Sequence, residues 1–398
     1  MFSRNVTLLT LCQFLSVSSS VLIVTLGGII GAALTPDPVL ATLPLSVMVV
    51  GTAAATVFAA MLMARVGRRR GFIAGACIAM VGAGIACLGL LHGQFGWFCA
   101  GIGLVGVNTA FVQQYRFAAA ESVLPGRAAT AISLVLAGSI GGALFAPLLT
   151  NIGASHDHAT SDAITYLPAI AAVIALQFVN ALVLACLREQ PALVQAEHVA
   201  AARPLRKIVG QPRYMIAVLG GVVGYGTMTL VMTATPLSMH LTHGFSVQDT
   251  ADVIRSHVLA MYLPSLVSGT LIAWIGAPRL MFAGVVCIAG TVAVGLQGHA
   301  LHHYAWSLVL LGVGWNFLYV GGTALLLQTY RENEKYTAQA VNEFSVFGSS
   351  ALASLLAGSV IHWFGWNTLL LTTAPALLLM VIGLAWLFQT GRERVPAH

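Results

Sequence analysis

The chain has 398 residues, of which 58% are hydrophobic and only 8% are charged. A water-soluble domain of this length carries about 25% charged residues, so the composition excludes one and indicates a polytopic membrane protein. The net charge of +6 comes from cations spread over loops, which fits membrane topology and gives no reason to expect a nucleic-acid partner.

Twelve hydrophobic segments follow along the chain, each near the roughly 20 residues that cross a bilayer as a helix. The first six cover residues 5–33, 39–64, 72–91, 96–119, 128–152 and 165–187, and the second six cover residues 214–240, 249–275, 280–298, 305–328, 338–362 and 367–389. The sequence therefore predicts an all-α membrane protein with an N-terminal six-helix bundle over 1–187, a cytoplasmic linker over 188–213 and a C-terminal six-helix bundle over 214–398.

The positive charges set the orientation of these spans. All of the 18 Lys and Arg residues except Arg255 lie at span ends or in loops of one side, and the loops of the other side contain none. Because loops rich in Lys and Arg resist translocation, both termini are predicted to be cytoplasmic. We expect a multi-pass protein of the bacterial inner membrane, surrounded by lipid and monomeric.

The two sets of spans also repeat each other. Residues 60–75 (AMLMARVGRRRGFIAG) align without a gap on residues 269–284 (GTLIAWIGAPRLMFAG), and six positions agree, including Gly67 with Gly276 and Arg70 with Arg279. Two parallel six-span repeats are the architecture of one class of transporters, whose solute site lies between the repeats. The bundles are therefore predicted to be pseudo-symmetric.

This layout resembles the major facilitator superfamily over essentially the whole chain. The most specific local likeness is the loop after the second span, where Arg65, Gly67, Arg68 and Arg69 are similar to the family's Arg-x-Gly-Arg-Arg segment. In the family this loop latches the cytoplasmic gate, with the help of an Asp that is Ala64 here. The latch would then rest on the arginines, with Glu121 or helix C-terminal carbonyls as partners.

A second, partial likeness concerns the fifth span. Gly138 and Gly142 match the glycines of the family's antiporter motif, but the Pro expected next is Ala143. The resemblance implies export of the solute without establishing it.

Polar and aromatic side chains form stripes on the spans that, by the resemblance, line a central cavity. The aromatic stripe lies near the predicted midplane, away from the membrane interfaces, and suits a planar solute. Small, amide and Met side chains also serve helix packing, so that alternative stays open. The candidate cavity residues are Gln13, Asn108, Gln113, Arg116, Tyr225, Met228, Thr229, Tyr262, Trp315, Asn316, Tyr319 and Asn342.

Proton coupling has no obvious carrier, because spans one, seven and ten contain no carboxylate. The candidates are Glu343, His257, Asp252 and Glu121. A buried acid such as Glu343 could accept a proton, or it could pair with a cytoplasmic Arg. Arg255 is either a gating residue at the outer mouth of the cavity or the partner of Asp249 or Asp252.

Other function classes lack their motifs. The sequence has no phosphate-binding glycine loop and no nucleophile with a base, so we expect neither ATP-driven transport nor an enzyme, and no cofactor. Nine His residues on the outer side lack the close spacing of metal ligands, and no metal site is expected; they are His92, His156, His158, His240, His243, His299, His302, His303 and His362.

Taken together, the sequence predicts a secondary transporter that moves a small, partly aromatic organic solute by alternating access, as proton-coupled efflux. Two alternatives remain open. One is uptake of a vitamin, such as a riboflavin-like heterocycle, or of an organic anion, for which Arg116 and Arg255 would be suited. The other is a transport-inactive receptor or sensor on the same fold.

Overall fold

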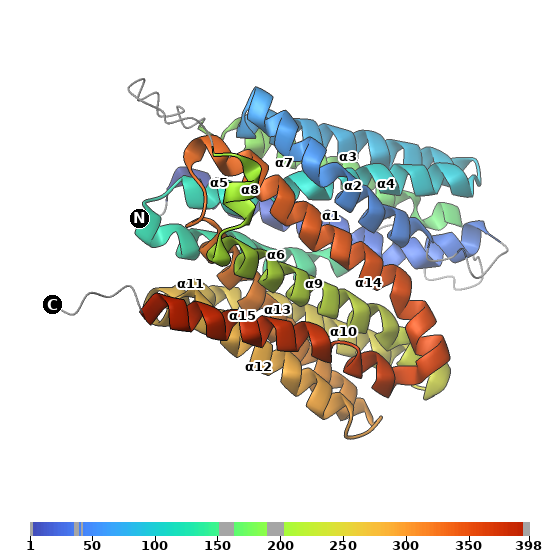
Figure 1. The fold of residues 1–398 in the computed structure, drawn as a ribbon. Helices are drawn as coiled ribbons and strands as arrows, with labels where there is room; N and C mark the ends of the chain where they lie inside the picture. Colours follow the sequence, from blue (N-terminus) through green and yellow to red (C-terminus); the bar gives the residue numbers. More distant parts are fainter. Residues whose placement is uncertain (1–2, 36–39, 41–42, 151–162, 189–202, 393–398) are drawn as a thin grey trace. The chain divides into compact units, whose positions relative to one another are not determined.

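The computed structural model describes residues 3–35, 40, 43–150, 163–188 and 203–392, and the regular elements in those ranges are helices (Figure 1). Most of the predicted linker, together with His156 and His158, lies outside the described residues. Eleven described helical stretches are long and apolar enough to cross a membrane. The last of them, Glu332–Gln389, is 58 residues long, so the division into twelve spans stays a prediction.

One compact unit comprises Met1–Pro125 and Leu134–Val199. Its helices, with the short elements that join them, are α1 (Arg4–Leu34), α2 (Leu43–Val66), α3 (Arg68–Leu91), α4 (Phe95–Val112), α5 (Tyr115–Glu121), η2 (Pro125–Arg127), α6 (Ala128–Thr150), η3 (Ala163–Tyr166) and α7 (Leu167–Ala185). Helix α4 packs against α2 and α3, and α7 packs against α1 and α3. The predicted fourth span is thus two helices, α4 and α5.

The second unit comprises Gly126–Ser133, which includes the start of α6, and Ala200–His398. Its other elements are α8 (Leu205–Val209), α9 (Pro212–Pro236), η4 (Leu237–Thr242), α10 (Val247–Tyr262), α11 (Ser265–Ile275), α12 (Ala277–Gly295), α13 (Leu301–Leu326), η5 (Glu332–Glu334), α14 (Lys335–Leu371) and α15 (Ala374–Arg392). Helix α13 is central to this unit, because it packs against α9, α10 and α12.

The aligned segments of the two units share a backbone conformation. Gly67 joins α2 to α3 with φ 88° and ψ 163°, and Gly276 joins α11 to α12 with φ 84° and ψ 154°. Side chains other than hydrogen are rarely tolerated there, which explains glycine at both positions. Eight residues later, Gly75 brings α3 close to Phe111 of α4, and Gly284 brings α12 close to the Gly314 carbonyl of α13.

Within the second unit, one predicted span is interrupted and one predicted loop lies inside a kinked helix. The predicted eighth span divides at Pro264 into α10 and α11, because proline has no N–H to continue the ladder. Helix α14 runs from Lys335 to Leu371, through a kink at Gly365 with φ 74°. That glycine lies where the sequence predicts the loop between the last two spans.

An ion pair connects the chain before α8 to the segment before α14. The Arg203 guanidinium donates to both carboxylate oxygens of Glu334, at 2.8 Å and 2.6 Å, and to the carbonyl of Thr329. The backbone amides of Arg203 and Arg331 also donate to this carboxylate, which is fully buried. These donors hold the pKa of Glu334 at about 2, well below its ordinary value.

Candidate functional site

Five aromatic rings gather inside the second unit, from four different helices. Tyr225 of α9 lies edge-on to Trp315, Tyr319 and Phe347, with centroid distances of 5.2 Å, 5.1 Å and 5.0 Å. Tyr262 of α10 lies edge-on to Trp315 at 5.8 Å. The four rings predicted from the sequence, all but Phe347, are thus brought together, and we call the five residues the aromatic cluster.

Helical spacing and small residues position the aromatic cluster. Trp315 and Tyr319 are four residues apart on α13, so they share a face, and their rings stack at 5.0 Å with an interplanar angle of 21°. Gly224 on α9 lets α13 approach, because a Cβ there would already lie 3.3 Å from Leu318. Tyr225 and Tyr262 remain partly exposed, whereas Trp315 is 1% exposed.

Polar residues of α9 and α14 belong to the same unit. Thr229 and Ser350 share a hydrogen bond of 2.7 Å between their hydroxyl oxygens, and Met228 is buried. Asn342, which precedes Phe347 on α14, donates to the Glu343 carboxylate at 2.7 Å. Both of these residues are buried, and Glu343 is 1% exposed. A buried carboxylate is costly to keep charged, and a proton-coupling role for Glu343 stays a prediction.

Asn316 forms three hydrogen bonds at the break between α10 and α11. Its amide donates to the Met261 carbonyl at 2.8 Å and to the Ser265 hydroxyl at 2.6 Å, and its carbonyl accepts from Ser268 at 2.7 Å. The side chain is 0% exposed. Asn316 therefore stabilises backbone that Pro264 has interrupted, while a cavity-lining role for it stays a prediction.

Among the candidate residues of the first unit, Arg116 contacts Gln113, whereas Gln13 and Asn108 lie on other helices. Gln13 of α1 donates to Ser139 of α6 at 3.0 Å, and Asn108 of α4 is buried. Arg116 follows the break between α4 and α5, is 2% exposed, and donates to Gln113 at 3.3 Å. Its guanidinium also lies 4.6 Å from the ring centroid of Phe117, a cation–π contact.

Sequence reasoning missed a buried polar network in the first unit. Asn180 of α7 donates to Ser16 of α1 and to the hydroxyl of Tyr115, and Gln177 donates to Ser19. Gln177 and Asn180 are both 0% exposed, and they bond to each other at 3.1 Å. Two amides three residues apart in an otherwise apolar helix were the signal that could have revealed this network.

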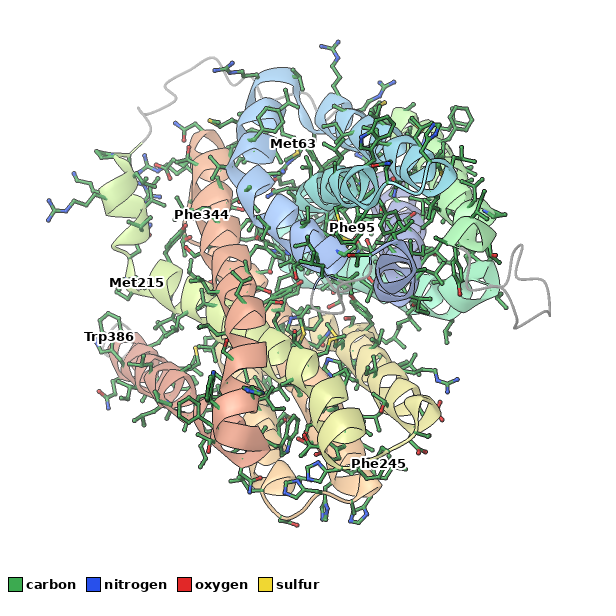
Figure 2. All side chains as sticks on the ribbon, turned by 90° about the vertical axis from the view of Figure 1, so that its right-hand side faces the viewer. Met63, Phe95, Met215, Phe245, Phe344 and Trp386 are labelled. Carbon is green, nitrogen blue, oxygen red and sulfur yellow. The ribbon has the colours of Figure 1, made fainter. Side chains whose placement is uncertain are left out.

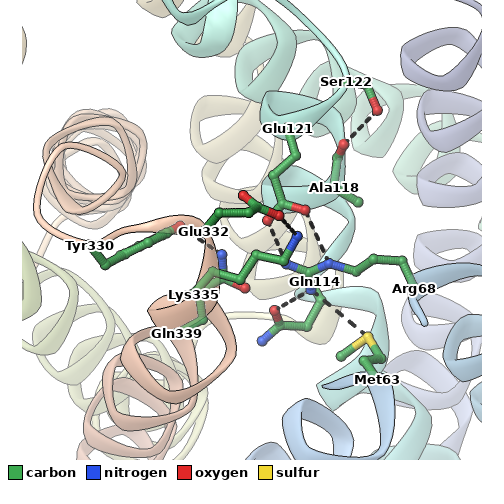
Figure 3. Close-up of polar contacts among 10 residues, drawn as sticks. All are labelled: Met63, Arg68, Gln114, Ala118, Glu121, Ser122, Tyr330, Glu332, Lys335 and Gln339. Carbon is green, nitrogen blue, oxygen red and sulfur yellow. Dashed lines mark hydrogen bonds and ion pairs between the residues drawn. The ribbon is translucent and has the colours of Figure 1, made fainter. Parts of the chain in front are cut away.

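At the predicted cytoplasmic end of the first unit, Arg68 pairs with Glu121 at the end of α5 (Figure 3). The two nitrogen–oxygen distances are 2.7 Å and 3.4 Å, and Arg68 also donates to Gln114 at 3.0 Å. Each side chain is 14% exposed. Of the family-like segment, Arg68 makes this pair, Gly67 supplies the turn, Arg65 is exposed and Arg69 is partly exposed. Their role in gating stays a prediction.

The structure pairs Arg255 with Asp252, one turn away on α10, and both side chains are about half exposed or more. Asp249 instead forms a capping box with Ser246 at the start of the same helix. The ion pair with Asp252 is one of the two sequence interpretations of Arg255, and a gating role for Arg255 stays a prediction. His257 is fully buried, and its Nδ1 lies 2.7 Å from the Leu308 carbonyl of α13.

Comparison with known proteins identifies the family. The model of the Major Facilitator Superfamily matches residues 8–319 and 217–398. The chain is 35% identical over 382 residues to the riboflavin transporter RfnT of Brucella anthropi, covering 96% of this chain and 95% of that protein. It is 27% identical over 404 residues to the uncharacterized MFS-type transporter YdeG of Bacillus subtilis, covering 97% and 92%. The chain belongs to the Major Facilitator Superfamily, and it is a secondary transporter of the bacterial inner membrane.

Solved structures show the same fold. The transporter FucP in the outward conformation superposes with a TM-score of 0.79 at 15% identity, covering 96% of this chain and 98% of that chain. The human organic anion transporter MFSD10 superposes with a TM-score of 0.74 at 14% identity, covering 96% and 99%. At these identities the likeness concerns the fold alone.

Proposed function

We propose that this transporter carries a planar heteroaromatic solute, with riboflavin as the first compound to test. The observation that carries the proposal is the aromatic cluster, because rings contributed by four helices offer stacking and edge contacts to a flat ring system. The 35% identity to a riboflavin transporter supports the same solute class. In this proposal the two repeats move by alternating access, driven by an ion gradient.

Uptake is the direction we propose first, and proton-coupled efflux is the second candidate. The antiporter-like glycines have a packing explanation, because a Cβ at Gly138 or Gly142 would lie 2.4 Å from the Thr10 carbonyl or 2.7 Å from the Phe14 carbonyl of α1. They therefore give efflux little independent support. What favours proton coupling is the buried Glu343, which could hold a proton in one state and release it in another.

Growth of a riboflavin-auxotrophic bacterial host without its own flavin carrier tests solute and direction together. We expect cells that express the chain to grow at riboflavin concentrations that do not support the empty-vector strain, and to accumulate labelled riboflavin. Tyr225→Leu should reduce initial uptake, since it removes the ring in contact with three others. Phe344→Leu is the matched control, because Phe344 on α14 is 56% exposed (Figure 2). Less accumulation of labelled riboflavin than in the empty-vector strain would favour efflux.

Proton coupling is tested in proteoliposomes loaded with a pH-sensitive dye. We expect riboflavin addition to change the internal pH, and Glu343→Gln to abolish that change while riboflavin still binds. Glu332→Gln is the control, since the Glu332 side chain is 71% exposed and is not a candidate carrier. Unaltered, proton-linked transport in the Glu343 variant would end its assignment as carrier. Binding without flux in wild-type vesicles would instead support the receptor alternative.

A further inference from the structure

Trp315 carries a buried hydrogen-bond donor that lacks an acceptor in the described part of the chain. The side chain is 1% exposed, and its Nε1 has no hydrogen-bond partner among the residues that the structure describes. An indole nitrogen is a donor only, so it needs an acceptor, and a buried donor without one is unfavourable. Phenylalanine at this position would be as apolar without leaving a buried donor unpaired, so the indole N–H itself calls for an explanation.

The neighbours of the indole are aromatic faces and edges. Tyr319 stacks on it, while Tyr225 and Tyr262 meet it at interplanar angles of 76° and 86°. An N–H directed at a ring face gains less than one directed at an oxygen or nitrogen acceptor. Tyr225 and Tyr262 are also the partly exposed members of the aromatic cluster, so the accessible surface next to the indole belongs to them.

Three polar side chains of the same unit, on α9, α13 and α14, already have partners. Asn316, the next residue on α13, uses both its amide nitrogen and its oxygen within the unit. The hydroxyls of Thr229 and Ser350 bond to each other at 2.7 Å. Trp315 therefore differs from these polar side chains in having a donor that no described residue satisfies.

We propose that the Trp315 N–H selects the solute by donating to an acceptor in the plane of its ring, either a ring nitrogen or a ring carbonyl oxygen. The inference rests on the proposed function and narrows it. It predicts that the transporter accepts heteroaromatic rings with an acceptor at the correct edge and discriminates against isosteres that carry C–H there. A ring without the acceptor is disfavoured because it leaves the buried donor unpaired.

The test compares two replacements of Trp315 by equilibrium binding of purified protein. Trp315→Phe removes the donor but changes the ring, and 3-benzothienylalanine at this position removes the donor while keeping the bicyclic shape. The probes are riboflavin and deazaflavins in each of which one ring nitrogen is replaced by C–H, with a pterin and a purine as other heteroaromatics. Phe347→Leu is the control variant, because it alters the cluster and retains the N–H.

We expect both replacements to weaken riboflavin binding by roughly 3- to 10-fold, as for one neutral hydrogen bond. For the deazaflavin that lacks the acceptor, the same replacements should have almost no effect, whereas Phe347→Leu should weaken all flavins alike. If the two replacements weaken the binding of every probe equally, or weaken the binding of none, the proposed role of Trp315 is wrong. The proposed flavin transport is unaffected by that result. The wild-type protein could instead bind the pterin or the purine in a way that depends on Trp315, and bind no flavin. In that case the proposal of riboflavin as solute is wrong and the proposed donor role of Trp315 is supported. If the wild-type protein binds no probe, both proposals fail.

Discussion

Gly67 shows how a single residue can be required by backbone conformation alone. No atom lies within 4 Å of a Cβ added there, but its φ of 88° is one that other residues rarely adopt. Gly67→Ala should therefore lower the free energy of unfolding by about 1–3 kcal/mol. Gly84→Ala is the control, since Gly84 lies inside α3 and its added Cβ also meets nothing. Equal thermal stability of the two variants in detergent would contradict this explanation.

The Arg68–Glu121 pair can be measured by a double-mutant cycle. Both side chains are mostly buried and share two nitrogen–oxygen contacts, so removal of either one breaks a largely buried ion pair. We expect each single alanine variant to cost about 1–3 kcal/mol and the double variant to cost less than their sum. Arg70→Ala, at an exposed position of the same helix, should be near neutral. An additive cycle would show that the pair contributes nothing.

At this scale, the sequence predicted residues whose chemistry is unusual inside a membrane. Tyr225, Tyr262, Trp315 and Tyr319 stand out because aromatic residues favour the interfaces, and the structure brings them together. Phe347 was missed because phenylalanine in an apolar helix carries no signal. The pairs of Arg255 with Asp252 and of Arg68 with Glu121 were among the predicted alternatives. The partners of the other polar groups could not be predicted, since they depend on which helices are neighbours.

Between elements, the contact of Arg203 with Glu334 gives a pH dependence with a definite sign. The pKa of Glu334 is lowered on folding, so the stability it contributes is fully present above the ordinary carboxyl pKa of 4.5 and is lost as the pH falls towards about 2. Glu334→Gln should lower the thermal midpoint at neutral pH and flatten this acid-induced loss. Glu332→Gln is the control, because the Glu332 side chain is 71% exposed. A wild-type acid profile in the Glu334 variant would contradict the assignment.

The helix break at Pro264 makes a second prediction at this scale. Asn316→Ala removes three hydrogen bonds and leaves the Met261 carbonyl without this donor, which should cost about 1–3 kcal/mol. Ser268→Ala removes only one of the three and should cost less. Thermal unfolding measures the loss of stability in the Asn316 variant. The KM for transport shows whether Asn316 also contacts the solute. A raised KM with unchanged stability would show that Asn316 binds the solute.

Hydropathy predicted where most helices lie, but not how they are interrupted. The break after α10 has a signal in Pro264, whereas the break between α4 and α5 falls in a segment without proline or glycine, between Val112 and Tyr115. Tertiary packing can override local preference at such points. The 58-residue stretch Glu332–Gln389, which contains α14 and α15, is a second place where the sequence did not predict the helix ends. Its composition is compatible with both a turn and a helix.

At the scale of the whole molecule, the orientation in the membrane can be tested with reporter fusions. If both termini are cytoplasmic, a fluorescent protein at the C-terminus should mature, and alkaline phosphatase inserted near Ala300 should be active. A fusion in the segment between Arg203 and Arg213 is the control, because it should leave alkaline phosphatase inactive. The reverse pattern at these sites would invert the predicted topology.

Gly67 and Gly276 have the same conformation in different electrostatic surroundings. The residue after Gly67 is Arg68, which pairs with Glu121, whereas the residue after Gly276 is Ala277, which carries no charge. A duplicated gene under selection would thus have kept the turn in both copies while the charges diverged. In a saturation library selected for function, both glycines should resist replacement to a similar degree, but the positions that follow them should tolerate different sets of residues.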